Sequence, residues 1–96
     1  MRLEIVEPAL DEADSARRYY ATINGELGDA FASELQRSIE WIVEQPLAWA
    51  PIGRRARRRL LNRFPYAVIY RVEADLIRIL AVTHQRQRPG YWRGRV

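Results

Sequence analysis

The sequence predicts an α+β fold, in which a hairpin of two helices packs on one face of a small curved antiparallel sheet in the order β-α-α-β-β-β. Two observations support this prediction. Apolar residues recur at helical spacing through most of residues 8–44, whereas residues 66–84 are rich in β-branched and aromatic residues, interrupted by a short Ala74-Asp75 turn. A chain of 96 residues has the length of one domain with a single small core, so we expect residues 1–96 to form one domain.

The first half of the chain predicts a short strand followed by the two helices. In residues 2–7, apolar side chains alternate with charged ones, as in a strand with one buried face. Pro8 is a favourable first residue for a helix, acidic residues fill the early turns, and Asn24-Gly25 is a stop signal. A second helix is predicted from about Leu27 to Glu44. Its apolar stripe consists of Leu27, Phe31, Leu35, Ile39 and Ile42.

The second half predicts three strands. Residues 46–53 contain two prolines and predict a loop. The arginine-rich stretch 54–64 could be helical, but its position before Pro65 and two clear strands favours a strand. Side chains alternate between the faces of a strand, so Arg55, Arg57, Arg59 and Arg63 would share one face, and Leu60 and Phe64 the other. Residues 66–73 and 75–84 complete the sheet as a hairpin.

The composition excludes several classes of site. The chain has no cysteine and one histidine, which excludes a disulfide framework and a transition-metal site of the usual kind. It has no glycine-rich phosphate loop, and its serines lie on predicted helices, away from any nucleophile turn. We therefore expect no cofactor and no metal. The sequence lacks an apolar run long enough for a membrane span and lacks a signal peptide, so we expect a cytoplasmic protein.

Charge is distributed unevenly along the chain. Residues 1–50 carry 4 basic and 10 acidic side chains, whereas residues 51–96 carry 12 basic and 2 acidic ones. Every basic side chain is arginine, whose planar guanidinium binds phosphates and carboxylates and stacks on aromatic rings. This basic half predicts a polyanionic partner, either a nucleic acid or an acidic protein segment.

The stretch HQRQRPGYW, residues 84–92, contains the remaining candidate residues. His84 could transfer a proton near neutral pH or form a local hydrogen bond at the end of the strand. Arg86 and Arg88 could stabilise negative charge or only flank the sheet edge. Tyr91 and Trp92 could stack on a base, although packing into the core is favoured for Trp92. Trp41 and Trp49 indicate either packing or a partner contact.

The order of elements resembles that of the RelE/ParE superfamily of type II toxins, and specific residues add to the resemblance. These residues are Arg63-Phe64-Pro65-Tyr66, Tyr70-Arg71, and His84-Gln85-Arg86 followed by Pro89 and Trp92. The resemblance implies a toxin that arrests growth and is encoded with an antitoxin. The acidic C-terminal segment of this partner would wrap around the toxin and neutralise it. Antitoxins of the superfamily pack against the helix hairpin and the open sheet edge, which implies that Trp41 and Trp49 are covered in the complex.

The superfamily has two main branches with different targets. RelE-like members cleave mRNA in the ribosome, and ParE-like members inhibit DNA gyrase. Aligned with the RelE branch, Arg86 matches a catalytic arginine, but Ala67 stands at the position of another functional arginine. Trp92 stands at the position of the catalytic tyrosine, with Tyr91 one residue early. The branch's lysines are absent, although Arg57 and Arg59 could replace them in binding phosphates.

This incomplete ribonuclease pattern favours a ParE-like toxin that binds gyrase without catalysis. The residues expected to bind the target or a partner are Arg57, Arg59, Arg86, Arg88, Tyr91 and Trp92. The alternative is a metal-independent, ribosome-dependent endoribonuclease that uses His84, Arg86 and Tyr91. A third possibility is a degenerate member that binds an antitoxin in a toxin–antitoxin hetero-oligomer but has lost its toxicity.

Overall fold

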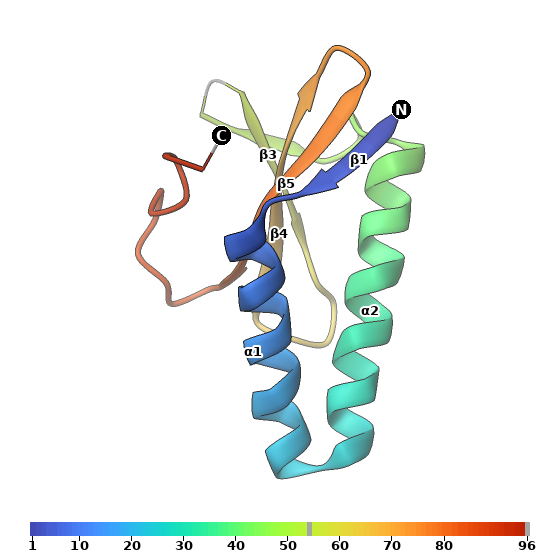
Figure 1. Ribbon diagram of the computed structural model, residues 1–96, viewed down its shortest axis with the longest axis vertical. Helices are drawn as coiled ribbons and strands as arrows, with labels where there is room; N and C mark the ends of the chain where they lie inside the picture. The colour runs from blue at the N-terminus through green and yellow to red at the C-terminus, as the bar shows by residue number, and fades with distance from the viewer. Residues whose placement is uncertain (54, 96) are drawn as a thin grey trace.

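The computed structural model describes residues 1–53 and 55–95, and it contains five strands and two helices (Figure 1). The strands are β1 (Arg2–Ile5), β2 (Ala50–Ile52), β3 (Ala56–Leu60), β4 (Tyr66–Glu73) and β5 (Leu76–His84). The helices are α1 (Glu7–Ile23) and α2 (Gly25–Glu44). The predicted α+β class and the order of the predicted elements are confirmed. None of the helices in these residues is long and apolar enough to cross a membrane.

The five strands form one sheet in the order β1-β5-β4-β3-β2. The pairs from β5 to β2 are antiparallel, but β1 pairs with β5 in parallel, with Arg2 opposite Leu76 and Ile5 opposite Ile79. The prediction of a purely antiparallel sheet is therefore wrong for this pair. No hairpin connects β1 to β5, because both helices and three strands lie between them in the chain, and such a long connection permits a parallel pair.

Asn24 separates the two helices. Its backbone N–H donates to Tyr20 O (3.0 Å) at the end of α1, and its side-chain oxygen accepts from Glu26 N (2.8 Å) at the start of α2. The helices then pack closely, because a Cβ atom on Gly28 would lie only 2.8 Å from Ala21 Cβ. The predicted break at Asn24-Gly25 is confirmed, and α2 begins at Gly25, two residues before the predicted start.

The main core lies between the helix hairpin and one face of the sheet. From the predicted stripe of α2, Phe31, Leu35 and Ile42 are buried, and Leu27 and Ile39 pack against them partly buried. This layer contains an aromatic cluster, in which the centroid of the Phe31 ring lies 5.2 Å from those of both Phe64 and Tyr66. Its edge-to-face contacts add to the apolar burial.

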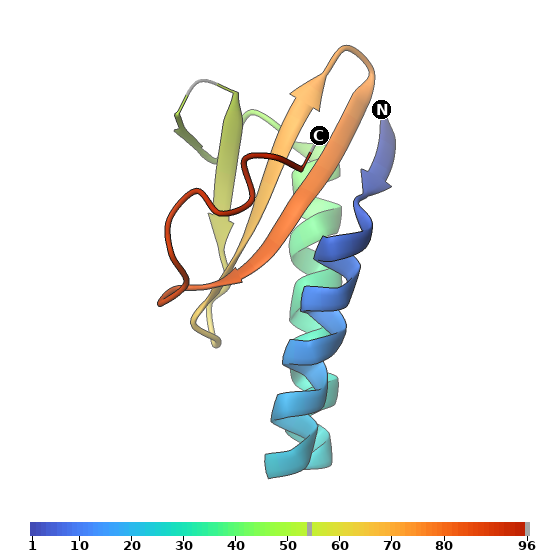
Figure 2. The ribbon, with the colours of Figure 1, turned by 60° about the vertical axis from the view of Figure 1, so that its left-hand side comes forward.

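The opposite face of the sheet is covered by residues 85–95, hereafter the C-terminal tail (Figure 2). A second, smaller apolar cluster lies beneath it, formed by Ala56, Ala67, Ile69, Leu80, Ala81 and Trp92. Trp92 is only 7% exposed, which confirms its predicted packing role. Because helices cover one face and the tail covers the other, β4 and β5 are buried on both sides, as their continuous apolar runs require.

The region between α2 and β4 differs from the prediction in detail. The predicted loop 46–53 contains the short edge strand β2, and β3 ends at Leu60 rather than at Phe64. Arg54, the first residue of the predicted strand, lies outside the described residues. Phe64 is buried in the helix-side core, whereas Leu60 on the other face is 48% exposed. The prediction that these two residues share a face is wrong, because the chain turns before Pro65.

Candidate functional site

Arg57 and Arg59 of β3 point toward the helix side of the sheet, where they are already engaged. Arg57 donates to Trp49 O (2.7 Å), which holds the connection after α2. The Arg59 guanidinium packs on two indole rings, 4.5 Å from the centroid of Trp41 and 4.6 Å from that of Trp49. Burial lowers the pKa of Arg59, an effect that the charge of Glu34 opposes. Trp41 remains 38% exposed, and its burial beneath a partner stays a prediction.

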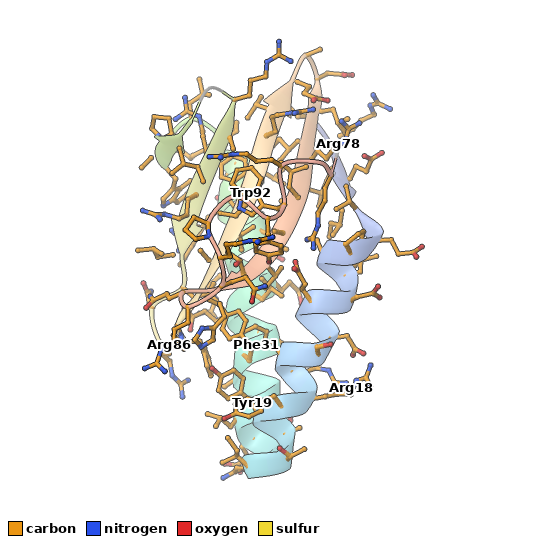
Figure 3. All side chains as sticks on the ribbon, turned by 90° about the vertical axis from the view of Figure 1, so that its left-hand side faces the viewer. Arg18, Tyr19, Phe31, Arg78, Arg86 and Trp92 are labelled. Carbon is orange, nitrogen blue, oxygen red and sulfur yellow. The ribbon has the colours of Figure 1, made fainter. Side chains whose placement is uncertain are left out.

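Arg58, which lies between them in sequence, points to the opposite face and was missed by the sequence reasoning. Together with Arg88 and Arg93 of the tail, it lines a groove of about 330 Å³. The apolar side of this groove is formed by Leu60, Ala67, Ile69 and Trp92. We call this hollow the tail-face groove. Figure 3 shows this face, with Trp92 lying over the sheet and Arg86 at the turn that leads into the tail.

Six of the described arginines that do not line this groove have carboxylate partners, namely Arg2, Arg17, Arg18, Arg71, Arg78 and Arg95. Arg78 binds Glu4 (2.6 Å) and Glu73 (2.8 Å), and Arg71 also pairs with Glu73. In contrast, eight arginines of the second half form no ion pair within residues 1–53 and 55–95, namely Arg55, Arg57, Arg58, Arg59, Arg63, Arg86, Arg88 and Arg93. Three of these eight, Arg58, Arg88 and Arg93, line the tail-face groove, so unpaired positive charge gathers beside an apolar surface.

His84, the last residue of β5, forms local contacts. Its Nδ1 accepts a hydrogen bond from Arg86 N (3.0 Å), and its ring packs edge-on against Tyr66 at 5.1 Å. An acceptor role for Nδ1 places the proton of the neutral ring on Nε2. The geometry is that of a histidine bonded to the following turn, which was one of the two sequence interpretations. The Arg86 guanidinium extends from this turn and is exposed.

Tyr91 and Trp92 are both committed to contacts within the chain. The Tyr91 hydroxyl donates to Glu12 Oε2 on α1 (2.6 Å). Burial, and next the hydrogen bond to Glu12, raise the pKa of Tyr91. The Trp92 ring is buried in the smaller apolar cluster, with the Arg93 guanidinium 5.5 Å from its centroid. The Trp92 ring is thus largely buried, and the Tyr91 ring is partly covered by the Arg95 guanidinium, 5.0 Å from its centroid.

The six residues predicted to bind a target therefore lie in several places. Arg57 and Arg59 lie on the helix side, Arg88 lines the tail-face groove, Arg86 lies at the turn, and Tyr91 and Trp92 pack inward. Among the candidate catalytic residues, His84 and Arg86 are adjacent, but the Tyr91 hydroxyl is directed at Glu12. The functional role of each of these residues stays a prediction.

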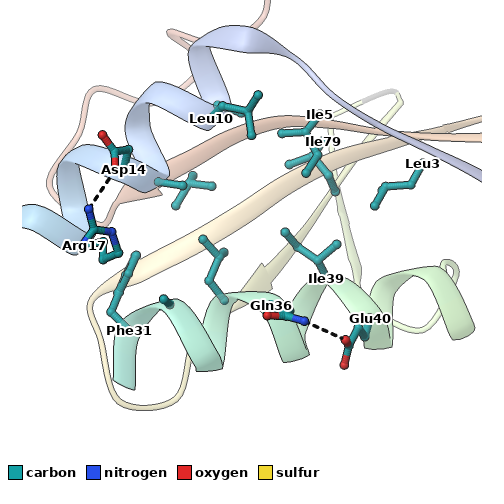
Figure 4. Close-up of a pocket in the computed structure, with 15 residues that line it drawn as sticks. Leu3, Ile5, Leu10, Asp14, Arg17, Phe31, Gln36, Ile39, Glu40 and Ile79 are labelled. Atoms are coloured by element: carbon teal, nitrogen blue, oxygen red, sulfur yellow. Dashed lines mark hydrogen bonds and ion pairs between the residues drawn. The ribbon is translucent and has the colours of Figure 1, made fainter. Parts of the chain in front are cut away.

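A second candidate surface lies on the other side of the molecule, between α1, α2 and β1 (Figure 4). It is an apolar groove of about 530 Å³, which we call the hairpin groove. Leu3 and Leu10 line it and are 43% and 51% exposed, and Ile39 faces them from α2. Polar pairs mark its rim, with Arg17 bonded to Asp14 (3.2 Å) and Gln36 to Glu40 (3.4 Å). Exposed apolar side chains gathered in one place are typical of interaction sites.

Comparisons with known proteins agree with this architecture. The solved structure of a chromosomal ParDE toxin–antitoxin system from P. aeruginosa contains a chain of similar fold, with a TM-score of 0.77 and 22% sequence identity over 88% of this chain and 95% of that one. None of the curated proteins compared with the chain matches it. Residues 3–89 match the family model described as the ParE toxin of the type II toxin–antitoxin system parDE. The resemblance seen in the sequence is thereby confirmed, and the chain belongs to the ParE toxin family of type II toxin–antitoxin systems.

Proposed function

We propose that this protein is a toxin that arrests growth in the cytoplasm by binding DNA gyrase, and that a cognate antitoxin neutralises it. The observation that supports the target-binding part is the tail-face groove, where three unpaired arginines surround an apolar floor. Arginine and buried aromatic anchors are enriched among the residues that dominate binding energy. Such a surface inhibits by occupying a partner and needs no reacting group.

The groove combines two kinds of contact. Its guanidinium groups attract acidic side chains or phosphates, which steers association and orients the partner. Its exposed apolar part, above all Leu60, can bury apolar surface of the partner that a purely electrostatic contact would leave exposed to water. A protein surface with acidic residues around an apolar side chain fits this combination better than a nucleic-acid backbone does.

The geometry argues against the ribonuclease alternative. A general base at Tyr91 would need a free hydroxyl that loses its proton readily, but this hydroxyl donates to Glu12 and burial raises its pKa. His84 Nδ1 is occupied by the N–H of Arg86. Cleavage would then depend on Arg86 and on the remaining nitrogen of His84, Nε2.

For the antitoxin we propose the hairpin groove as the main contact. A helix with an apolar face fits a groove between two helices, because its side chains at i, i+3, i+4 and i+7 enter the groove together. The hairpin half of the chain is acidic, so the acidic part of the antitoxin would extend to the unpaired arginines of the second half. The two parts of the antitoxin would thus meet surfaces of different chemistry.

The test of the target is supercoiling by purified gyrase in the presence of the folded protein. We expect inhibition that is reversed by the antitoxin encoded beside the toxin. Unimpaired supercoiling at protein concentrations well above that of gyrase would contradict the proposal. Translation reactions programmed with a defined message serve as the parallel assay, and cleavage of that message in the ribosome would instead support the endoribonuclease.

A further inference from the structure

One carboxylate connects three separate segments of the chain. Glu12 Oε1 accepts from Val82 N of β5 (3.0 Å) and from Arg95 Nη1 of the tail (2.8 Å). Its other oxygen, Oε2, accepts from the Tyr91 hydroxyl (2.6 Å). The Glu12 side chain is 23% exposed, so water screens these charge-assisted bonds only in part. A helix, the central sheet and the tail therefore meet at a single side chain.

The position of Glu12 is explained by the edge of the sheet. The β1 register along β5 ends where Ile5 lies opposite Ile79, so the rest of β5 lacks a neighbouring strand on that side. Two side chains bind the backbone groups that follow, because Arg95 Nη1 donates to Leu80 O (3.1 Å) and Glu12 accepts from Val82 N. The Glu12–Arg95 pair thus continues the ladder where β1 stops and satisfies backbone groups that would otherwise lack partners.

The same pair holds the tail on both sides of its apolar anchor. Tyr91 and Arg95 flank Trp92 in sequence, and both bind Glu12. The Arg95 guanidinium also lies 5.0 Å from the centroid of the Tyr91 ring. Loss of Glu12 would leave the tail attached mainly by Trp92. Because Arg88 and Arg93 of the tail line the tail-face groove, the shape of this groove depends on how the tail is fastened.

We propose that Glu12 is a positioning residue for the target-binding face: it fastens the C-terminal tail to β5 and so sets the tail-face groove. The claim that Glu12 fastens the tail is supported by its three hydrogen bonds alone. Its consequence for target binding rests on the proposed function. The two claims are therefore tested by separate measurements, one on the isolated protein and one with gyrase.

The first measurement is amide hydrogen exchange of wild type, Glu12→Ala and the matched control Glu7→Ala. Glu7 lies on the same helix and is exposed, and its side chain forms no hydrogen bond or ion pair within the described residues. We expect the amides of Val82, Arg93 and Arg95 to exchange at least about tenfold faster in Glu12→Ala, since a hydrogen bond to a charged group is lost. The amides of α2 and β4 should keep their protection, and Glu7→Ala should leave the tail unchanged.

A uniform loss of protection throughout Glu12→Ala, or a tail that exchanges as in wild type, would overturn the fastening role. Should Glu12→Ala fail to fold, the double variant Tyr91→Phe with Arg95→Gln removes two of the three bonds from the tail side. The same local acceleration in residues 90–95, with α2 and β4 unchanged, is expected there. Its absence would equally overturn the proposal.

The second measurement compares gyrase inhibition with antitoxin affinity. We expect Glu12→Ala to require about tenfold more protein for half-inhibition, while Glu7→Ala behaves as wild type. Antitoxin affinity of Glu12→Ala should change by less than about threefold, because neither Glu12 nor the tail lines the hairpin groove, the proposed main antitoxin contact. A merely unstable toxin would lose both interactions. Faster tail exchange with unchanged inhibition would overturn the positioning role. A wild-type protein that does not inhibit gyrase would defeat the proposed function instead, and the exchange comparison would still decide whether Glu12 fastens the tail.

Discussion

Arg57, Arg58 and Arg59 show how one residue step along β3 changes the role of an arginine. Arg57 and Arg59 are held by Trp49 and Trp41 on the helix side, whereas Arg58 lines the tail-face groove. A guanidinium that is already engaged gains little from a new partner. An unpaired guanidinium beside apolar surface can form a new charge-assisted contact. Of the three, Arg58 is therefore the one that we expect to contribute most to target binding.

We predict that Arg58→Glu weakens gyrase inhibition by about tenfold or more, because a like charge replaces an attractive one at the interface. The matched control is Arg37→Glu, which makes the same charge change on the exposed surface of α2. Supercoiling assays at several protein concentrations give the two inhibition constants. Both variants should unfold in urea within about 0.5 kcal/mol of wild type, because both side chains are exposed. Equal inhibition by the two variants would remove Arg58 from the target-binding face.

Only part of this site could be predicted from single residues. Alternation along the strand correctly placed Arg57 and Arg59 on one face and Leu60 on the other, and Trp92 was correctly assigned to packing. The alternation of side chains along β3 does not reveal which face of the sheet the tail covers, because the tail has no regular apolar pattern that would predict its position. Glu12 was missed for a similar reason, since an acidic residue in the first turns of a helix is explained by the helix dipole alone.

At the scale of elements, the contact between α1 and α2 depends on Gly28. A Cβ atom there would approach Ala21 Cβ to 2.8 Å and Arg17 O to 3.1 Å, so the two helices would have to move apart. The same hairpin forms two walls of the hairpin groove. The width of this groove, and with it the proposed antitoxin site, is therefore coupled to a single small residue.

We predict that Gly28→Ala destabilises the protein by about 1 kcal/mol, since overpacking costs about 1–3 kcal/mol and the higher helix propensity of alanine offsets about 1 kcal/mol. Gly25→Ala is the control, because nothing lies within 4 Å of the added Cβ. That variant should be neutral or slightly more stable. Urea unfolding followed by circular dichroism measures both. A Gly28→Ala protein more stable than wild type would show that the helices separate freely.

The elements themselves were predictable where the signal is local. Asn24-Gly25 marked the break between the helices, and Ala74 at the β4–β5 turn has a φ of 47°, as a tight turn requires. The edge strand β2 was predicted as a loop, because three residues that include Pro51 carry no strand pattern. The parallel direction of β1 depends on the path of the whole chain, which no local pattern reports.

For the whole molecule, the division of charge follows the division into layers. The first 50 residues, with 10 acidic and 4 basic side chains, supply β1 and the helix layer, and the basic second half supplies the other four strands and the tail. The two grooves consequently lie on opposite sides of the sheet in different electrostatic surroundings. The proposed gyrase-binding surface and the proposed main antitoxin contact, the hairpin groove, can thus be changed independently.

We predict that a saturating antitoxin raises the melting temperature of the toxin by about 10 °C or more, because it binds only the native state. Leu10→Asp, which puts a charge into the hairpin groove, should remove most of this increase. Ser33→Asp adds the same charge to an exposed position of α2 that does not line the groove, and it should keep the increase. Differential scanning fluorimetry with and without antitoxin provides the comparison. An undiminished shift for Leu10→Asp would exclude the hairpin groove as the antitoxin site.

The pairing of β1 with β5, and of Glu12 with the tail, has a consequence for folding during synthesis of the chain. During synthesis the two helices can form early from local contacts, but β1 has no neighbour until residues 76–79 have been added. The tail-face groove needs residues 88–93, which are added later still. A growing chain therefore lacks both interaction surfaces until residues 76–93 have been added. We therefore expect the antitoxin and the target to bind only after this part of the chain has been made.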